Sequence, residues 1–195
     1  MAALTWAVYQ EPIQGENCCG DAYLVHQDID TGIVALIDGL GHGIEAAYAA
    51  NRAVELLAQN KNLNGISSIK LLHKQLRSTR GIVLGLIIIN FSANQLNYWG
   101  IGNIQVQIRS KTTCSLVSAS GVVGFRLPKH LINQQYPFYP GDYLLMLTDG
   151  IKTDWEWPDA LISNRGTPSQ IVAFLGDNYA KSEDDTTILV IKRQD

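Results

Sequence analysis

The spacing of apolar residues along the chain follows two patterns, and each pattern predicts one kind of element. Short runs rich in β-branched and aromatic residues, bounded by Gly, Asn or Asp, are typical of strands. We expect strands at residues 21–27, 32–37, 82–90, 95–99, 103–109, 112–118, 143–147 and 186–192. Apolar residues three and four positions apart predict amphipathic helices instead. We expect helices at residues 44–59, 66–76 and 169–179.

The order of these elements indicates the fold class. The helices are clustered and do not alternate one for one with the strands, which argues against a doubly wound parallel sheet. Consecutive hairpins joined to a helix pair are typical of an α+β domain with mainly antiparallel sheets. The runs "IVLGLIII" and "YLLMLT" are apolar at successive positions, so both faces of these strands should be covered. We therefore expect one domain over residues 1–195, a four-layer α-β-β-α sandwich in which two sheets are flanked by helices.

Composition and charge narrow the class of partner. With 46% hydrophobic and 17% charged residues among 195, the chain is long and apolar enough for one sizeable core. Its net charge of -3 leaves no excess of Lys or Arg to neutralise a nucleic acid or an anionic membrane. The longest apolar stretch, residues 82–89, is far shorter than the roughly 20 residues that span a bilayer. We therefore expect neither nucleic acid nor membrane as a partner.

Cysteine usage and the first residues indicate the compartment. The start "MAALTWAVYQEP" has no basic residue and reaches a charge at Glu11, so it does not resemble a secretory signal. The cysteines are Cys18, Cys19 and Cys114, an odd number that suits reduced thiols better than a disulfide framework. No CxxC pattern indicates zinc. These features predict a cytoplasmic protein.

Aspartates stand at the ends of several predicted strands. Asp21 follows Gly20 at the start of one strand, and Asp38 precedes Gly39 at the end of the next. If the two strands form a hairpin, Tyr23 faces Ile37. Asp21 then lies beside Asp38 and Gly39 at the open end of the hairpin.

A second pair of aspartates is placed in the same way. Asp149 leaves the strand at 143–147, and Asp184 enters the strand at 186–192. An antiparallel arrangement of these strands would bring the two carboxylates together at one edge. If both pairs share that edge, the carboxylates crowd into one pocket.

Crowded carboxylates favour a bound cation, because like charges raise one another's pKa values unless a positive charge intervenes. Oxygen ligands without His or Cys suit Mg²⁺ or Mn²⁺. Two such ions about 3.5–4 Å apart would acidify a bridging water and position it for attack on phosphorus. Each Asp-Gly or Gly-Asp dipeptide alone is an ordinary turn. The combination of order, placement and spacing is what favours a metal site.

Motifs across most of the chain resemble a known family. The segments "CCGDAYL", "ALIDGLGHGIEAA", "LMLTDGI" and "EDDTTILVIK" occur in this order. They resemble the metal-dependent PPM-type serine/threonine protein phosphatases, specifically the bacterial SpoIIE-like branch. The resemblance runs from about residue 17 to residue 192. It implies a central β-sandwich with paired helices on both outer faces.

The resemblance also implies a role for each matching position. Asp38 would bridge two Mn²⁺ or Mg²⁺ ions, and the carbonyl of Gly39 would bind the first ion. Asp149 and Asp184 would bind the second ion. Asp21 would hold the first ion through its water shell.

Departures from the family pattern are mild. Thr148 stands where serine is commoner, and we expect no effect because this residue lies outside the ligand set. The phosphate-binding arginine near the N-terminus of the eukaryotic relatives has no counterpart here. The resemblance to the bacterial branch therefore implies that the metal ions alone bind the substrate phosphate.

Several residues near these motifs carry two interpretations each. His42 is either a general acid for the leaving oxygen or a residue that stabilises the turn and the helix start. Arg80 either approaches the phosphate or is a solvated cation at a helix end. Trp155 and Trp157 form either a substrate-facing flap or local packing.

The sequence therefore predicts a metal-dependent phosphatase that acts on phosphoserine or phosphothreonine of a partner protein. The resemblance implies a STAS-domain regulator in a partner-switching pathway as that substrate. Two other functions stay open: a phosphatase-like module that docks a STAS protein or an anti-sigma kinase without turnover, and a hydrolase of a small phosphorylated molecule. No Walker-type loop supports nucleotide binding. No oligomeric state is predicted.

Overall fold

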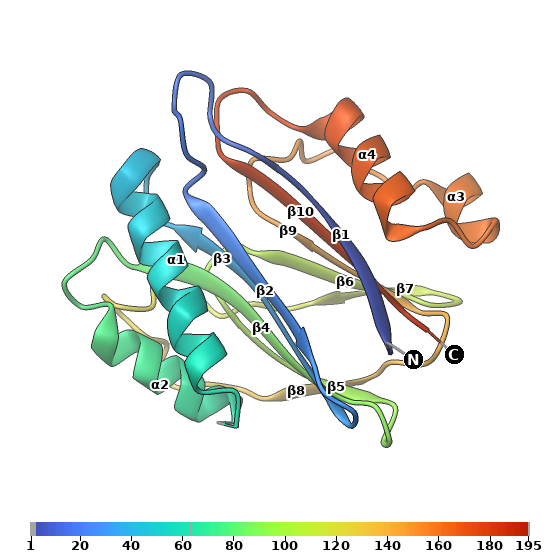
Figure 1. Ribbon diagram of the computed structural model, residues 1–195, viewed down its shortest axis with the longest axis horizontal. Coiled ribbons are helices and arrows are strands. Elements are labelled where there is room, and N and C mark those ends of the chain that lie inside the picture. The colour runs from blue at the N-terminus through green and yellow to red at the C-terminus, as the bar shows by residue number, and fades with distance from the viewer. Residues whose placement is uncertain (1–2, 63, 195) are drawn as a thin grey trace.

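Two five-stranded sheets lie face to face at the centre of the molecule, with helices on both outer faces (Figure 1). The computed structural model describes residues 3–62 and 64–194. The strands are β1 (Leu4–Glu11), β2 (Asp21–Gln27), β3 (Thr31–Gly39), β4 (Ile82–Asn90), β5 (Gln95–Ile101), β6 (Gln105–Arg109), β7 (Thr113–Leu116), β8 (Gln134–Pro137), β9 (Tyr143–Leu147) and β10 (Thr186–Arg193). The helices are α1 (Gly43–Gln59), α2 (Gly65–Gln75), α3 (Asp159–Ser163) and α4 (Pro168–Tyr179).

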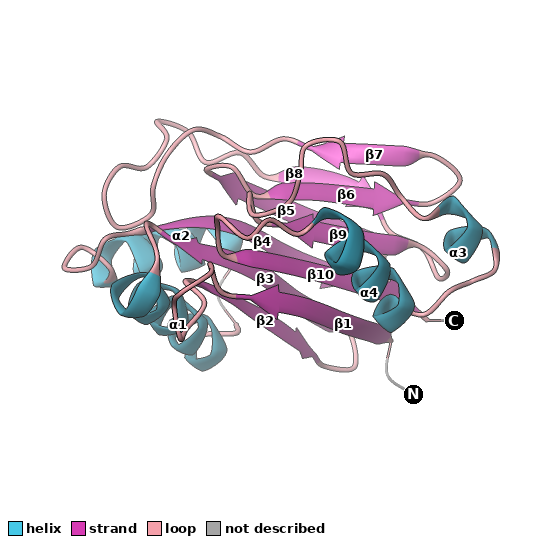
Figure 2. Ribbon diagram, turned by 90° about the horizontal axis from the view of Figure 1, so that it is seen from above, coloured by secondary structure: helices cyan, strands magenta, loops and turns pink. Residues whose placement is uncertain are grey.

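The order of strands separates the chain into two layers. One sheet has the order β1-β10-β9-β6-β7, and the other has the order β2-β3-β4-β5-β8. All strand pairs within the two sheets are antiparallel. Helices α1 and α2 cover the second sheet, whereas α3 and α4 lie on the side of the first (Figures 1 and 2). The predicted α-β-β-α sandwich is confirmed.

Strand β9 shows why apolar residues occupy successive positions. Leu144 and Met146 point into the core between the two sheets. Leu145 and Leu147 point the other way, into a second core beneath α4. Because successive side chains of a strand face opposite sides, a strand in the middle of four layers must be apolar at every position. The expectation that such strands are covered on both faces is confirmed.

Three elements were not predicted: β1, β8 and α3. Strand β1 lies at the edge of its sheet and its residues are mostly half-buried or exposed, so apolar alternation is weak there. Strand β8 is four residues long with no buried residue, and α3 is a five-residue helix with no buried residue. Short, exposed elements leave little hydrophobic pattern in a sequence.

The hairpin of β2 and β3 is confirmed, but its predicted register is wrong by one residue. Tyr23 pairs with Leu36 and not with Ile37. The backbone N–H of Asp28 donates to the carbonyl of Thr31, which leaves a connection of two residues. This even-numbered connection places Asp21 directly opposite Asp38.

No helix within residues 3–62 and 64–194 combines the length and the apolar character needed to cross a bilayer.

Candidate metal centre

The predicted aspartates meet at one end of the sandwich, where both sheets contribute strand ends. Asp38 is the last but one residue of β3 in one sheet, whereas Asp149 follows β9 and Asp184 precedes β10 in the other. These three carboxylates line a hollow of about 350 Å³. His42 and Asn103 line the same hollow. The structure therefore brings Asp38, Asp149 and Asp184 together as predicted, whereas Asp21 is not among the residues that line the hollow.

Asp38 lies at the centre of this negative charge. Burial raises the pKa of its carboxyl to about 8, and the charges of neighbouring aspartates contribute to the rise. These neighbours are Asp21, Asp149, Asp184 and Asp185. No Lys or Arg among the described residues that line the hollow offsets the repulsion between these carboxylates. A bound cation would relieve it.

Asp21 lies behind the hollow and does not line it. Its side chain is only 4% exposed, and burial raises the pKa of its carboxyl to about 7. The hydroxyl of Thr148 donates to Asp21 Oδ2 at 2.9 Å and accepts from the backbone N–H of Thr187 at 2.8 Å. Since the amide donates to Oγ1, the hydroxyl proton is free to point at Asp21.

Asp149 and Asp184 are held from several sides. Asn103 Nδ2 donates to Asp149 Oδ2 at 2.7 Å, and Lys181 Nζ donates to the Asp149 carbonyl at 2.6 Å. Asp184 Oδ1 accepts from the backbone N–H of Asp185 at 2.9 Å. Burial and the charge of Asp149 raise the pKa of Asp184, while Lys181 opposes the rise.

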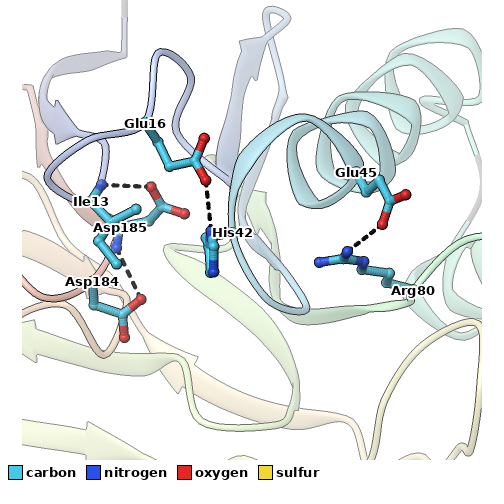
Figure 3. Close-up of polar contacts among 7 residues, drawn as sticks. All are labelled: Ile13, Glu16, His42, Glu45, Arg80, Asp184 and Asp185. Atoms are coloured by element: carbon cyan, nitrogen blue, oxygen red, sulfur yellow. Dashed lines mark hydrogen bonds and ion pairs between the residues drawn. The ribbon is translucent and has the colours of Figure 1, made fainter.

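Asp185 is a member of the cluster that the sequence did not single out. Its side chain is 4% exposed, and Oδ1 accepts from the backbone N–H of Ile13 at 3.0 Å (Figure 3). Oδ2 is buried and has no hydrogen-bond partner among the described residues. A carboxylate oxygen buried without a donor is costly, and a nearby cation would offset that cost.

Two glycines allow the backbone to pass close to neighbouring segments. A Cβ on Gly39 would lie 2.2 Å from the carbonyl oxygen of Ala46 in α1. A Cβ on Gly150 would lie 2.1 Å from the carbonyl oxygen of Asp185. Any other residue would push the Gly39 backbone away from α1 and the Gly150 backbone away from Asp185, so glycine is required at both positions.

His42 is the residue before the first turn of α1, yet its side chain makes no capping hydrogen bond. Its Nδ1 lies 2.8 Å from Glu16 Oε1 (Figure 3). His42 is also one of the residues that line the hollow. His42 therefore occupies the N-cap position without a capping side-chain hydrogen bond, and its role as a general acid stays a prediction.

Arg80 forms an ion pair with Glu45, in the first turn of α1 (Figure 3). Its guanidinium also packs against Gly41, where an added Cβ would lie 2.7 Å from the nearest nitrogen. Arg80 is thus an exposed cation paired with Glu45, and it is not among the residues that line the hollow.

The two tryptophans pack locally. Trp155 Nε1 donates to Gln105 at 3.2 Å, and Trp157 Nε1 donates to Gln107 at 2.8 Å. Their rings meet edge to face, with centroids 6.2 Å apart, against the core beneath α4. The local-packing interpretation is confirmed.

A family model described as Stage II sporulation protein E (SpoIIE) matches residues 30–194. This chain belongs to the SpoIIE family. The predicted resemblance is thereby confirmed over most of the chain.

Individual relatives of the SpoIIE-family chain agree with this assignment. The phosphoserine phosphatase RsbX of Bacillus subtilis (strain 168) is 26% identical over 147 residues, covering 74% of this chain and 73% of RsbX. A solved structure described as "The bacterial stressosome: a modular system that has been adapted to control secondary messenger signaling" is 32% identical. Its TM-score is 0.90, and the match covers 97% of this chain and 99% of that one.

The fold also agrees with a second solved structure. RsbX in complex with magnesium has a TM-score of 0.84 and 22% identity, covering 98% of this chain and 96% of that one. The chain thus has the PPM phosphatase fold and is homologous to a phosphoserine phosphatase.

The donor set of this SpoIIE-family site fits hard divalent cations. Asp38, Asp149 and Asp184 offer carboxylate oxygens into one hollow, and the buried Oδ2 of Asp185 has no donor. Oxygen donors suit Mg²⁺ and Mn²⁺. As the side chains stand, no three His, Cys, Asp or Glu residues in the described part are arranged tightly enough to hold an ion. Binding therefore requires carboxylates to turn toward the ion.

Replacing Thr148 with valine should destabilise the protein by about 1–3 kcal/mol. The change removes the donor to Asp21 and the acceptor for the amide of Thr187, and both groups are buried. Urea denaturation without added metal measures the loss. Thr148→Ser keeps the hydroxyl and should lose no more than about 1 kcal/mol for the missing methyl group. Equal losses for the two variants would contradict this account.

Sequence reasoning missed the contacts that hold the aspartates in place. Thr148 was expected to have no effect, yet it binds Asp21. Asn103, Lys181 and Glu16 come from loops and turns far away in the sequence. The doublet of Asp184 with the residue after it was the one available signal, because a buried strand start rarely carries two acidic residues.

Proposed function

We propose that this chain is a metal-dependent protein serine/threonine phosphatase that uses two Mn²⁺ or Mg²⁺ ions. The observation that carries the proposal is the hollow at the end of the sandwich, where carboxylates from both sheets face one another. Membership of the SpoIIE family and homology to a phosphoserine phosphatase support it. The chain acts as one domain over residues 1–195, in the cytoplasm.

The proposed ligands are the strand-end residues. Asp38 would hold both ions, and the Gly39 carbonyl would bind the first of them. Asp149 and Asp184 would bind the second ion, while Asp21 would act on the first through water. When bound, the ions neutralise phosphate charge and lower the pKa of water. Thr148, Asn103 and Lys181 hold these ligands in place by the hydrogen bonds described above.

His42 is the proposed general acid. Attack of a water oxygen on phosphorus forms a new P–O bond and breaks the bond to the serine or threonine oxygen. That leaving oxygen needs a proton, which the ring of His42 donates from the rim of the hollow. The products are inorganic phosphate and the free hydroxyl side chain.

The proposed substrate is a phosphorylated STAS-domain protein of a partner-switching pathway. Similarity to RsbX and to a stressosome structure supports this class of partner. Helix α1, which begins directly after His42, carries exposed apolar side chains at Ile44 (80% exposed) and Tyr48 (64% exposed). Exposed apolar side chains of this kind suit contact with a protein partner.

Release of inorganic phosphate from a phosphorylated STAS protein tests the proposal. The purified chain should release phosphate only when Mn²⁺ or Mg²⁺ is present. Tight binding without turnover would contradict the enzyme and favour the docking module. Hydrolysis of small phosphate esters without action on the phosphoprotein would favour the third function.

A further inference from the structure

Glu16 contacts the proposed general acid from outside the metal centre. It lies in the loop between β1 and β2, and its Oε1 is 2.8 Å from His42 Nδ1 (Figure 3). The second ring nitrogen, Nε2, is on the side of the ring away from Glu16. Since His42 lines the hollow, this contact leaves Nε2 as the ring nitrogen free for a substrate.

The loop that carries Glu16 is anchored to the metal centre itself. The backbone N–H of Ile13 donates to Asp185 Oδ1 at 3.0 Å, and that of Gln14 donates to the Ser182 carbonyl at 3.1 Å. The N–H of Glu16 donates to the Ile13 carbonyl at 3.1 Å. The position of the Glu16 carboxylate is thereby tied to the segment that holds Asp184.

The start of α1 also accommodates this carboxylate. A Cβ on Gly43 would lie 3.0 Å from both carboxylate oxygens of Glu16, and the φ angle of Gly43 is +73°. A glycine here leaves room for Glu16 above the first turn. The amides of a helix N-terminus favour a negative charge at this place.

Fold stability does not account for the contact. The side chain of His42 is 59% exposed and that of Glu16 is 34% exposed. Exposed ion pairs contribute little to folding stability. The same carboxylate is well suited to orient an imidazole, because it only accepts hydrogen bonds and so keeps a proton on Nδ1.

We propose that Glu16 is a positioning residue that holds His42 with Nδ1 bound and Nε2 directed at the leaving oxygen. This inference rests on the proposed phosphatase function. In the reaction Nε2 gives its proton to the serine oxygen as the P–O bond breaks. The other proton stays on Nδ1 and continues to donate to the Glu16 carboxylate. The neutral ring that forms is therefore the Nδ1–H tautomer.

The test compares two leaving groups. Serine is a poor leaving group that needs a proton, whereas p-nitrophenolate leaves without one. Glu16→Gln should lower kcat for a phosphoserine peptide about 10-fold and leave kcat for p-nitrophenyl phosphate unchanged within about 2-fold. Glu55→Gln is the matched control, because Glu55 forms an exposed 2.8 Å ion pair with Arg52 in the same helix. It should change neither rate.

A double-mutant cycle with His42→Gln adds a second measurement. If Glu16 acts through His42, the double variant should be no slower on phosphoserine than His42→Gln alone. Thermal melting of each variant checks folding, and Glu16→Asp should recover part of the phosphoserine rate. Equal losses on both substrates, or additive losses in the cycle, would overturn the role of Glu16. If the unmodified chain hydrolyses neither substrate with Mn²⁺, the proposed function fails and this inference fails with it.

Discussion

Asp38→Asn should lower metal-dependent phosphatase activity by at least about 10³-fold, since ligation by a central carboxylate contributes several kcal/mol to the transition state. Asp38 is the residue on which the charges of all the neighbouring aspartates converge. An amide has nearly the same shape as a carboxylate but carries no charge for a cation to neutralise. The measurement is the initial rate of phosphate release at saturating Mn²⁺.

The other end of the same hairpin offers a matched control. Asp30 lies in the exposed connection between β2 and β3, away from the hollow. Asp30→Asn removes the same charge and should leave the rate unchanged. A comparable loss of activity in both variants would contradict this account. It would show that the activity depends on the net charge of the protein and not on a carboxylate at position 38.

Without metal, the protein should lose stability as the pH rises from about 4 to about 8. Burial and neighbouring charges raise the pKa of Asp38 to about 8, and burial raises that of Asp21 to about 7. The unfolded carboxyls have a pKa of about 3.9. Between these values the folded state binds more protons than the unfolded state, so the free energy of unfolding falls as the pH increases.

Metal should reverse this loss. Ions bind the ionised carboxylates of the folded state, so the stabilisation by Mn²⁺ should be larger at pH 8 than at pH 5. At a concentration 100 times the dissociation constant it amounts to about 2.7 kcal/mol, or an increase in Tm of about 5–10 °C for a chain of this length.

Thermal melting at several pH values, with and without Mn²⁺, checks both statements. Asp38→Asn should raise the Tm of the metal-free protein at pH 8, because it removes the most strongly perturbed carboxylate, and should reduce the increase caused by Mn²⁺. A metal-free Tm that rises between pH 5 and pH 8 would contradict the charge account. So would a variant that melts lower than the unmodified protein at pH 8.

The layers of the fold could be predicted because buried strands leave a strong pattern. Strands β4 and β9 were predicted with the bounds that the structure shows, since each is apolar at successive positions and ends at polar or turn residues. The hairpin of β2 and β3 could also be predicted, and with it the pairing of Asp21 and Asp38. The predicted register was wrong by one residue because it depends on the length of the connection between β2 and β3. The pattern of apolar residues does not determine that length.

The contacts around the aspartates could not be predicted in the same way. Glu16 reaches His42 from a loop without regular structure, and Asn103 reaches Asp149 from a turn. Each is a single polar residue, and its partner depends on how distant segments pack. Asp185 is buried because Ile13 and Gly20 lie against it, which no local pattern shows.

Anomalous diffraction from crystals of this chain grown with Mn²⁺ tests the central claim most directly. The account predicts two manganese peaks about 3.5–4 Å apart in the hollow, with Asp38 bound to both and with Asp149 and Asp184 on one of them. Peaks elsewhere on the molecule, or ions in the hollow that Asp38 does not contact, would contradict it.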